Sequence, residues 1–246
     1  MVIKCIYFDL DDTLINTTQV FKEEFKKSNL KFSEAIKNSI EKYKDVPLKK
    51  IYSKVKKIRT EIIKKYGSNY PKQFDKTLTK LDIKYNEQLI SVGVTSYHIE
   101  KHKQLYYNEE LYNYLKKISK SYKIGILSDG MALKQWDKIN YVLGHKQDLF
   151  TKENVIISGI FGIGKTSDKI FHELLRREDF KPSEILYVGD KYEKDIKRPK
   201  RLGFKTAFMN NKNMKSYVED TKKLKPKPDF ILNSIYDLED CDEIRF

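Results

Sequence analysis

The sequence predicts a doubly wound α/β fold, with a parallel-sheet (Rossmann-like) core and an inserted all-helical domain. Two observations lead to this fold class. Six short runs of apolar, largely β-branched residues recur along the chain, and amphipathic helical patterns separate most of them. The stretch from about residue 16 to residue 105, in contrast, contains no such run and has helical periodicity.

The six apolar runs are expected to form the strands of the sheet. Each run is short and alternates little between apolar and polar residues, which is typical of parallel strands that are covered on both faces. The runs comprise residues 3–8, 123–127, 154–158, 185–189, 205–209 and 229–233. Between them, residues 109–122, 131–144 and 168–177 have the apolar stripe of surface helices.

The helical stretch is expected to be a separate domain inserted after the first strand. It is rich in Lys and Glu, with helical periodicity at residues 18–44 and 48–67. Gly67 is expected to end the second of these helices. We therefore assign residues 1–15 and 106–246 to the α/β core and residues 16–105 to the helical domain.

The composition sets limits on the class of protein. The 246 residues include 49 Lys and Arg against 35 Asp and Glu, a net charge of +14. The basic residues are dispersed among acidic and apolar ones, so nucleic-acid binding is the less favoured interpretation. Because the sequence lacks an apolar stretch of ~20 residues and the order of a signal peptide, a cytoplasmic protein is expected. Cys5 and Cys241 indicate neither a disulfide framework nor a zinc site.

The first apolar run ends in a cluster of acidic residues, in which Asp9, Asp11 and Thr13 form the pattern D-x-D-x-T. Ligands of parallel α/β sheets bind beyond the carboxyl ends of the strands. Two adjacent carboxylates resist joint ionisation unless a cation neutralises them, which favours one metal-bound carboxylate and one carboxyl that carries a proton. The alternative is structural, with residues 11–13 capping a following turn.

Two further segments carry groups suited to binding an anion. Ser128 directly follows the second run with a hydroxyl, and the amides of Asp129 and Gly130 come next near a helix start. An ordinary strand-to-helix turn is the alternative there. Lys165 follows a glycine-rich loop and precedes a helix, so its ammonium group can be aimed at a phosphate.

A second acidic segment follows the fourth run, with Asp190 directly after the strand and Asp195 beyond it. The carboxylate of Asp190 can meet those of Asp9 and Asp11 if the first and fourth strands are neighbours. Oxygen ligands without an accompanying His or Cys cluster favour Mg²⁺ over zinc.

In their order along the chain, these four elements resemble the signatures of the haloacid dehalogenase superfamily, in its aspartate-nucleophile phosphatase branch. The helical insert resembles the cap domain of that family. Residues 65–78, 93–106 and 124–139 are also similar to an archaeal subgroup described as glyceraldehyde 3-phosphate phosphatases. One departure is Thr166, which stands where the family usually has a proline after the lysine.

The resemblance implies a Mg²⁺-dependent phosphatase with a covalent intermediate. Asp9 would be the nucleophile, and Asp11 would act first as general acid and then as general base. Mg²⁺ would be held by the carboxylates of Asp9 and Asp190 and the backbone carbonyl of Asp11.

The remaining site residues would bind the phosphoryl group or support those that do. Ser128, Asp129 and Lys165 would bind it directly. Thr13 and Asp195 would orient this set from outside, with Asp195 anchoring Lys165. The cap would close over the substrate and exclude bulk water.

The expected substrate is a small phosphorylated metabolite, with glyceraldehyde 3-phosphate as the candidate. A phosphomutase of the same fold stays open, because it would keep the same acid. A 2-haloacid dehalogenase is less favoured, because halide leaves without a proton and needs no acid at Asp11. A monomer and a dimer are equally compatible with the sequence.

Overall fold

A parallel sheet of six strands forms the centre of the α/β core. In chain order the strands are β1 (Cys5–Phe8), β2 (Lys123–Ser128), β3 (Val155–Ile157), β4 (Ile185–Gly189), β5 (Lys205–Met209) and β6 (Phe230–Leu232). They are hydrogen-bonded in the order β3-β2-β1-β4-β5-β6, and every pairing is parallel. Five of the six predicted runs contain a whole strand, and the second contains β2 except for Ser128, so the fold class and the strand assignments are confirmed.

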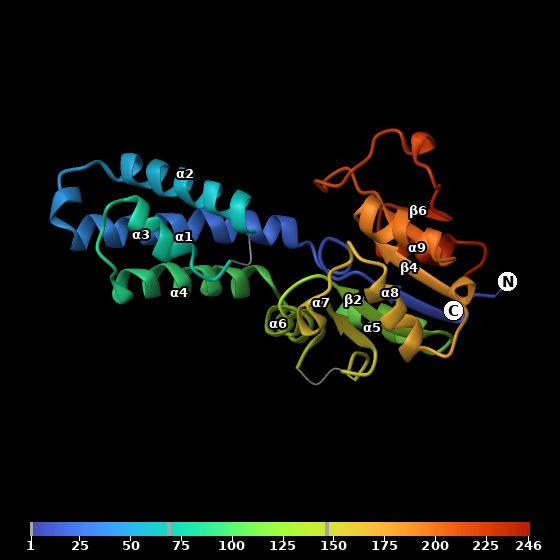
Figure 1. The fold of residues 1–246 in the computed structure, drawn as a ribbon. Coiled ribbons are helices and arrows are strands. Elements are labelled where there is room, and N and C mark those ends of the chain that lie inside the picture. The colour runs from blue at the N-terminus through green and yellow to red at the C-terminus, as the bar shows by residue number, and fades with distance from the viewer. Residues whose placement is uncertain (1, 68–69, 146–147) are drawn as a thin grey trace. The chain divides into compact units, whose positions relative to one another are not determined.

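The computed structural model describes residues 2–67, 70–145 and 148–246, which separate into two compact units (Figure 1). One unit combines residues 1–18 with residues 107–246, and the other comprises residues 19–106. The sequence-based division falls instead after residue 15 and after residue 105.

Helices cover both faces of the sheet in the first unit. Every residue of β1 and of β4 is buried, although successive side chains point to opposite faces. The covering helices present apolar stripes, such as Leu111, Leu115 and Ile118 on α5 (Glu109–Ile118). The other helices of this unit are α6 (Ala132–Leu143), α7 (Ser158–Phe161), α8 (Lys169–Arg177) and α9 (Lys197–Arg201).

The second unit is a helical bundle. It consists of most of α1 (Thr17–Ser39), together with α2 (Leu48–Tyr66), α3 (Gln73–Lys80) and α4 (Glu87–Gln104). Phe32, Val55 and Leu78 belong to its apolar core. The prediction that Gly67 ends a helix is confirmed, because it is the C-cap of α2 with a φ of 87°, in the region that favours glycine.

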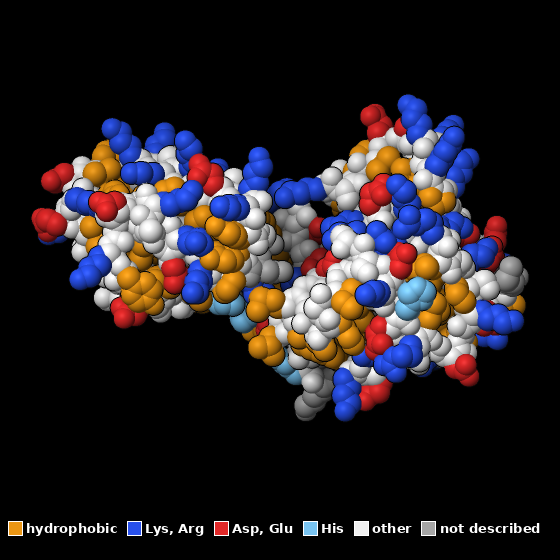
Figure 2. Space-filling model, viewed as in Figure 1, with side chains coloured by type: hydrophobic (Ala, Val, Ile, Leu, Met, Phe, Trp, Pro, Cys, Tyr) orange, Lys and Arg blue, Asp and Glu red, His pale blue; other side chains and the backbone are white. Residues whose placement is uncertain are grey.

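The charged surface matches the dispersed pattern of the sequence. On the face shown in Figure 2, basic side chains are distributed over both units, with acidic side chains among them. Within the described part of the chain, no helix combines the length and the apolar character needed to cross a membrane.

Candidate active site

The order of the strands brings the sequence-predicted site residues to one edge of the sheet. β1 lies between β2 and β4, and Phe8 is in register with both Ile126 and Val188. Asp9 therefore follows the central strand, flanked by Ser128 at the end of β2 and Asp190 after β4.

Asp9 lies in a buried, hydrogen-bonded position. Its side chain is buried, and Oδ1 accepts a hydrogen bond of 2.8 Å from the amide of Leu10. The same oxygen lies 2.9 Å from Nζ of Lys165. Burial raises the pKa of Asp9 to about 6, against the opposing attraction of Lys165. Both of these contacts are made by Oδ1.

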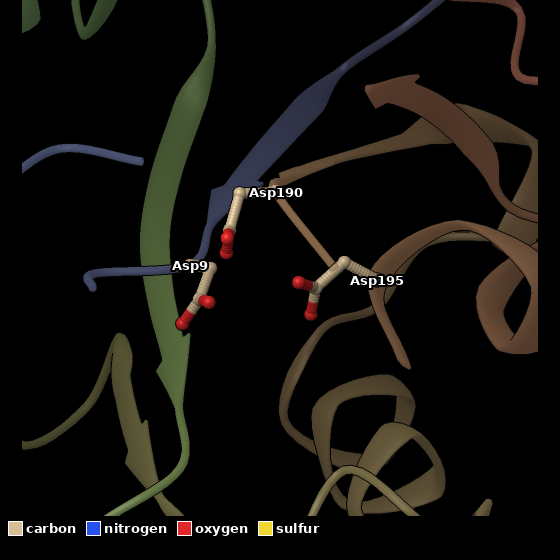
Figure 3. Close-up of side chains that lie close together, drawn as sticks. All are labelled: Asp9, Asp190 and Asp195. Atoms are coloured by element: carbon tan, nitrogen blue, oxygen red, sulfur yellow. The ribbon is translucent and has the colours of Figure 1, made fainter. Parts of the chain in front are cut away.

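Asp9, Asp190 and Asp195 form an acidic cluster. One carboxylate oxygen of each lies within 4.8 Å of the others, and Figure 3 shows the three side chains converging. Asp190 accepts hydrogen bonds from Lys191 Nζ at 3.1 Å and Ser216 Oγ at 2.8 Å. Burial raises the pKa of Asp190 above its ordinary value. A set of buried carboxylates of this kind can hold a metal ion.

Asp195 reaches the cluster from a π-helical turn, Tyr192–Ile196, that follows β4. A Cβ atom at Gly189, the last residue of β4, would lie 2.4 Å from Cβ of Asp195, so only glycine permits this close approach. The amide of Lys191 donates to Asp195 Oδ2 at 2.9 Å. The turn therefore fixes the Asp195 carboxylate against the end of the central strands.

Lys165 is the buried cation at the centre of this group. Its side chain is 1% exposed, and Nζ lies 2.7 Å from Asp195 Oδ1 as well as 2.9 Å from Asp9 Oδ1. Nζ also donates to the hydroxyl of Tyr187 at 3.4 Å. Burial opposes the charged form of Lys165, but the attraction of Asp195 and Asp9 outweighs it and holds the pKa of Lys165 well above its ordinary value. The lysine is therefore a permanent positive charge beside Asp9.

The carboxylate of Asp129 supports the loop that carries Lys165. Its Oδ1 accepts a hydrogen bond of 2.8 Å from the amide of Lys165, and its Oδ2 accepts one of 2.8 Å from Lys194 Nζ. The amide of Gly130, expected to face an anion, donates instead to Ser158 Oγ at 3.0 Å. Of the two amides expected to contact a phosphate at this turn, that of Asp129 still can do so, and this contact stays a prediction.

Asp11 is separated from the acidic cluster by its partners. Its Oδ1 pairs with Lys138 Nζ at 2.5 Å, and its Oδ2 accepts a hydrogen bond of 3.0 Å from Gln135 Nε2. Burial favours the neutral carboxyl, but Lys138 and Gln135 outweigh it and lower the pKa of Asp11. The predicted metal contact through the backbone carbonyl of Asp11 stays a prediction.

Gln135 and Lys138 were not predicted from the sequence. Both belong to α6, which follows Ser128, and they are three residues apart and so share one face of the helix. Gln135 is buried and also donates to Ser128 Oγ at 2.7 Å. The only signal in the sequence is a pair of polar residues at helical spacing after the second strand, which is common on solvated helices.

The side chain of Thr13, which follows the acidic residues after β1, is buried. Its Oγ1 has no hydrogen-bond partner among the residues that the structure describes. Its supporting role therefore stays a prediction, whereas Asp9, Lys165, Asp190 and Asp195 form one connected group.

Comparison with known proteins identifies relatives over most of the chain. A family model, haloacid dehalogenase-like hydrolase, matches residues 3–203. The glyceraldehyde 3-phosphate phosphatase of Pyrococcus abyssi is 37% identical over 208 residues, which cover 84% of this chain and 81% of that protein. The protein of the same name from Pyrococcus furiosus is 34% identical over 234 residues, or 95% of this chain and 90% of that protein.

Solved structures share the fold at lower identity. A 2-haloacid dehalogenase from Pseudomonas syringae pv. Tomato DC3000 has a TM-score of 0.61 at 21% identity, covering 98% of both chains. A HAD phosphatase from Thermococcus onnurineus has a TM-score of 0.58 at 17% identity, covering 97% of both chains. At these identities the likeness establishes the fold and leaves the reaction to be argued from the site.

Proposed function

The chain belongs to the haloacid dehalogenase-like hydrolase family, and from this membership we propose that it is a Mg²⁺-dependent phosphatase that forms a phosphorylated Asp9. The enzyme class predicted from the motifs, a phosphoric monoester hydrolase, is confirmed by the family and by relatives named as phosphatases. The proposal of Mg²⁺ dependence and a phosphorylated Asp9 rests on one observation. Lys165, Asp190 and Asp195 converge on the buried carboxylate of Asp9.

The substrate proposed is a small phosphorylated metabolite, with glyceraldehyde 3-phosphate as the first candidate. The support for this candidate is the name shared by the relatives, of which this chain covers more than four fifths. We further propose that residues 16–105 are the cap domain of the enzyme.

A divalent cation fits the acidic cluster. The three buried carboxylates of Asp9, Asp190 and Asp195 are balanced by two lysines, Lys165 and Lys191, so the cluster lacks one positive charge. Burial raises the pKa of both Asp9 and Asp190, and the repulsion of a neighbouring carboxylate adds to this in each case, so a bound cation would favour the ionised forms of both. Carboxylate and carbonyl oxygens suit Mg²⁺.

We propose that Asp9 and Asp190, together with the backbone carbonyl of Asp11, hold Mg²⁺. When bound, the ion would supply positive charge that favours ionised Asp9 and offsets the charge of the phosphoryl oxygens. Asp195 would keep its contact with Lys165 and hold that lysine in position.

In the first half of the reaction, Asp9 attacks the phosphorus atom. Its carboxylate forms the new bond to phosphorus as the bond from phosphorus to the ester oxygen breaks. Asp11, which takes up a proton against the pKa-lowering effect of Lys138, transfers that proton to the ester oxygen and is left as a carboxylate. Lys165 and Ser128 stabilise the charge on the transferring phosphoryl group.

In the second half, water releases the phosphate. The Asp11 carboxylate takes a proton from a water molecule as the oxygen of that water attacks the phosphorus atom. The bond between phosphorus and Asp9 breaks, which regenerates the Asp9 carboxylate and frees inorganic phosphate. The two halves together return Asp11 to its protonated state.

Removal of Mg²⁺ is expected to abolish activity. After treatment with EDTA, phosphate release from p-nitrophenyl phosphate should fall by roughly 100-fold or more and return when Mg²⁺ is added. Mg²⁺ should also raise the thermal unfolding temperature of the wild type, because it binds only the folded state. Both effects are measured on the same preparation, by phosphate assay and by differential scanning fluorimetry.

The Asp190→Asn variant tests whether the cluster is the metal site. It should lose the Mg²⁺-induced rise in unfolding temperature, whereas Asp220→Asn, which changes an exposed carboxylate paired with Lys223 outside the cluster, should keep it. Full activity in EDTA would contradict the proposed metal dependence. A panel of phosphate esters that includes glyceraldehyde 3-phosphate then tests the substrate, and an isomerised ester in place of free phosphate would indicate a phosphomutase.

A further inference from the structure

The two oxygens of Asp11 are both held by one helix. Lys138 Nζ lies 2.5 Å from Oδ1, and Gln135 Nε2 donates to Oδ2 at 3.0 Å. Both partners come from α6, where Trp136, the single tryptophan of the chain, lies between them in sequence. The contacts join residues more than 120 positions apart, so they are set by the tertiary fold and not by local sequence.

Gln135 connects Asp11 to the end of β2. Its side-chain amide nitrogen lies 2.7 Å from Ser128 Oγ, 2.9 Å from the carbonyl of Asp129 and 3.0 Å from Asp11 Oδ2. The residue is 2% exposed, so water does not compete strongly for these acceptors. One amide group therefore fixes Asp11 relative to the serine proposed to bind the phosphoryl group.

Lys138 differs from an ordinary surface ion pair. Exposed pairs contribute little because water and salt screen them. The side chains of Lys138 and Asp11 are only 18% and 26% exposed, and the lysine contacts the residue proposed to donate the proton. The ion pair therefore fixes the position of the Asp11 side chain in the site.

We propose that Gln135 and Lys138 are positioning residues for the proton-transfer step of the proposed phosphatase reaction. They hold the Asp11 carboxyl beside Ser128, in the orientation from which its proton can pass to the leaving oxygen. This inference rests on the proposed function of Asp11 as general acid.

The contacts that hold Asp11 also bear on the class of substrate. An alkoxide is a poor leaving group and needs the proton, whereas p-nitrophenolate departs without one. The arrangement around Asp11 is therefore suited to alkyl phosphates, such as the phosphate esters of sugars and trioses, more than to activated aryl phosphates.

The experiment compares Lys138→Met with the wild type on glycerol phosphate and on p-nitrophenyl phosphate. We expect kcat to fall by roughly 100-fold for the alkyl ester and by about threefold or less for the aryl ester. Lys138→Arg, which keeps the charge, should recover most of the loss on the alkyl ester. Lys117→Met removes a surface ion pair with Glu239 in the same unit and should change neither rate.

Gln135→Met provides a second, uncharged test of the same arrangement. It should show the same preferential loss on the alkyl ester, with folding checked by circular dichroism. Equal losses on both esters in Lys138→Met, or no loss on either, would overturn the inference. A wild-type protein without activity on both esters would instead overturn the proposed function, so the two failures are distinguishable.

Discussion

The Asp9→Asn variant is expected to lose phosphatase activity by roughly 10⁴-fold or more in kcat, with its fold intact. The amide that replaces the carboxylate has nearly the same shape but cannot attack phosphorus. The measurement is phosphate release in the presence of Mg²⁺, on protein shown to be folded by circular dichroism. Activity close to that of the wild type would remove Asp9 from the mechanism.

The same variant should be at least as stable as the wild type in the absence of metal. The pKa of Asp9 rises from 3.8 to about 6 on folding, so above pH 6 the folded protein must hold a charge that burial disfavours. This costs up to roughly 3 kcal/mol at pH 8, and the cost falls between pH 6 and about pH 4, where Asp9 is protonated in the folded state but still ionised in the unfolded state. Urea unfolding in EDTA at pH 8 and pH 5 measures the difference.

Asp12→Asn is the matched control for Asp9→Asn. Asp12 lies in the same acidic segment, but its Oδ1 accepts a hydrogen bond from the amide of Thr18 and its Oδ2 accepts one from the hydroxyl of Thr18, at the start of α1. Its φ of 59° is in the left-handed region, which Asn tolerates. This variant should lose about 1 kcal/mol of stability and keep kcat within roughly threefold of the wild type.

Lys165→Met is expected to lower both activity and stability. Lys165 is the buried cation between Asp9 and Asp195, so its removal leaves two buried carboxylates without the ammonium group that pairs with both. Breaking a buried ion pair in this way costs about 3–5 kcal/mol of unfolding free energy. Because Lys165 is also proposed to contact the phosphoryl group, kcat should fall by roughly 10³-fold.

The destabilisation of Lys165→Met should depend on pH with a definite sign. Without the lysine, the pKa of Asp9 rises further, so the variant takes up a proton on acidification and recovers part of its stability. The loss relative to the wild type should therefore be larger at pH 8 than at pH 5. Lys194→Met is the control, since its partner Asp129 is partly exposed and its loss should stay within about 1 kcal/mol. An equal loss in the two variants would contradict the central position of Lys165.

The sheet could be predicted from the sequence because each strand is buried on both faces. Residues such as Ile185–Gly189 must then be apolar without alternation, and that pattern differs from the helical stripes around them. The helical domain was recognisable because residues 16–105 contain no short apolar run of this kind. Pro199 lies inside the short helix α9. It occupies the first turn of α9, where a missing amide proton costs nothing.

The candidate site was predictable where it depends on strand ends. Asp9, Ser128 and Asp190 each follow or end an apolar strand, so their convergence follows from the order of the strands. Gln135 and Lys138 depend instead on how α6 packs beside β1, and no single-sequence pattern encodes that contact. The expected phosphate-facing amide of Gly130 was wrong for a similar reason, since Ser158 from a neighbouring element accepts its hydrogen bond.

Helix α6 also gives the protein an intrinsic optical reporter. Trp136 is the only tryptophan of the chain and adjoins Gln135 in the helix that holds Asp11. Its fluorescence therefore reports on this one helix, without contributions from other indoles. The binding of a ligand that rearranges the surroundings of Asp11 can therefore be followed through Trp136 fluorescence. The measurement uses unlabelled wild-type enzyme and reaches the timescale of a single turnover.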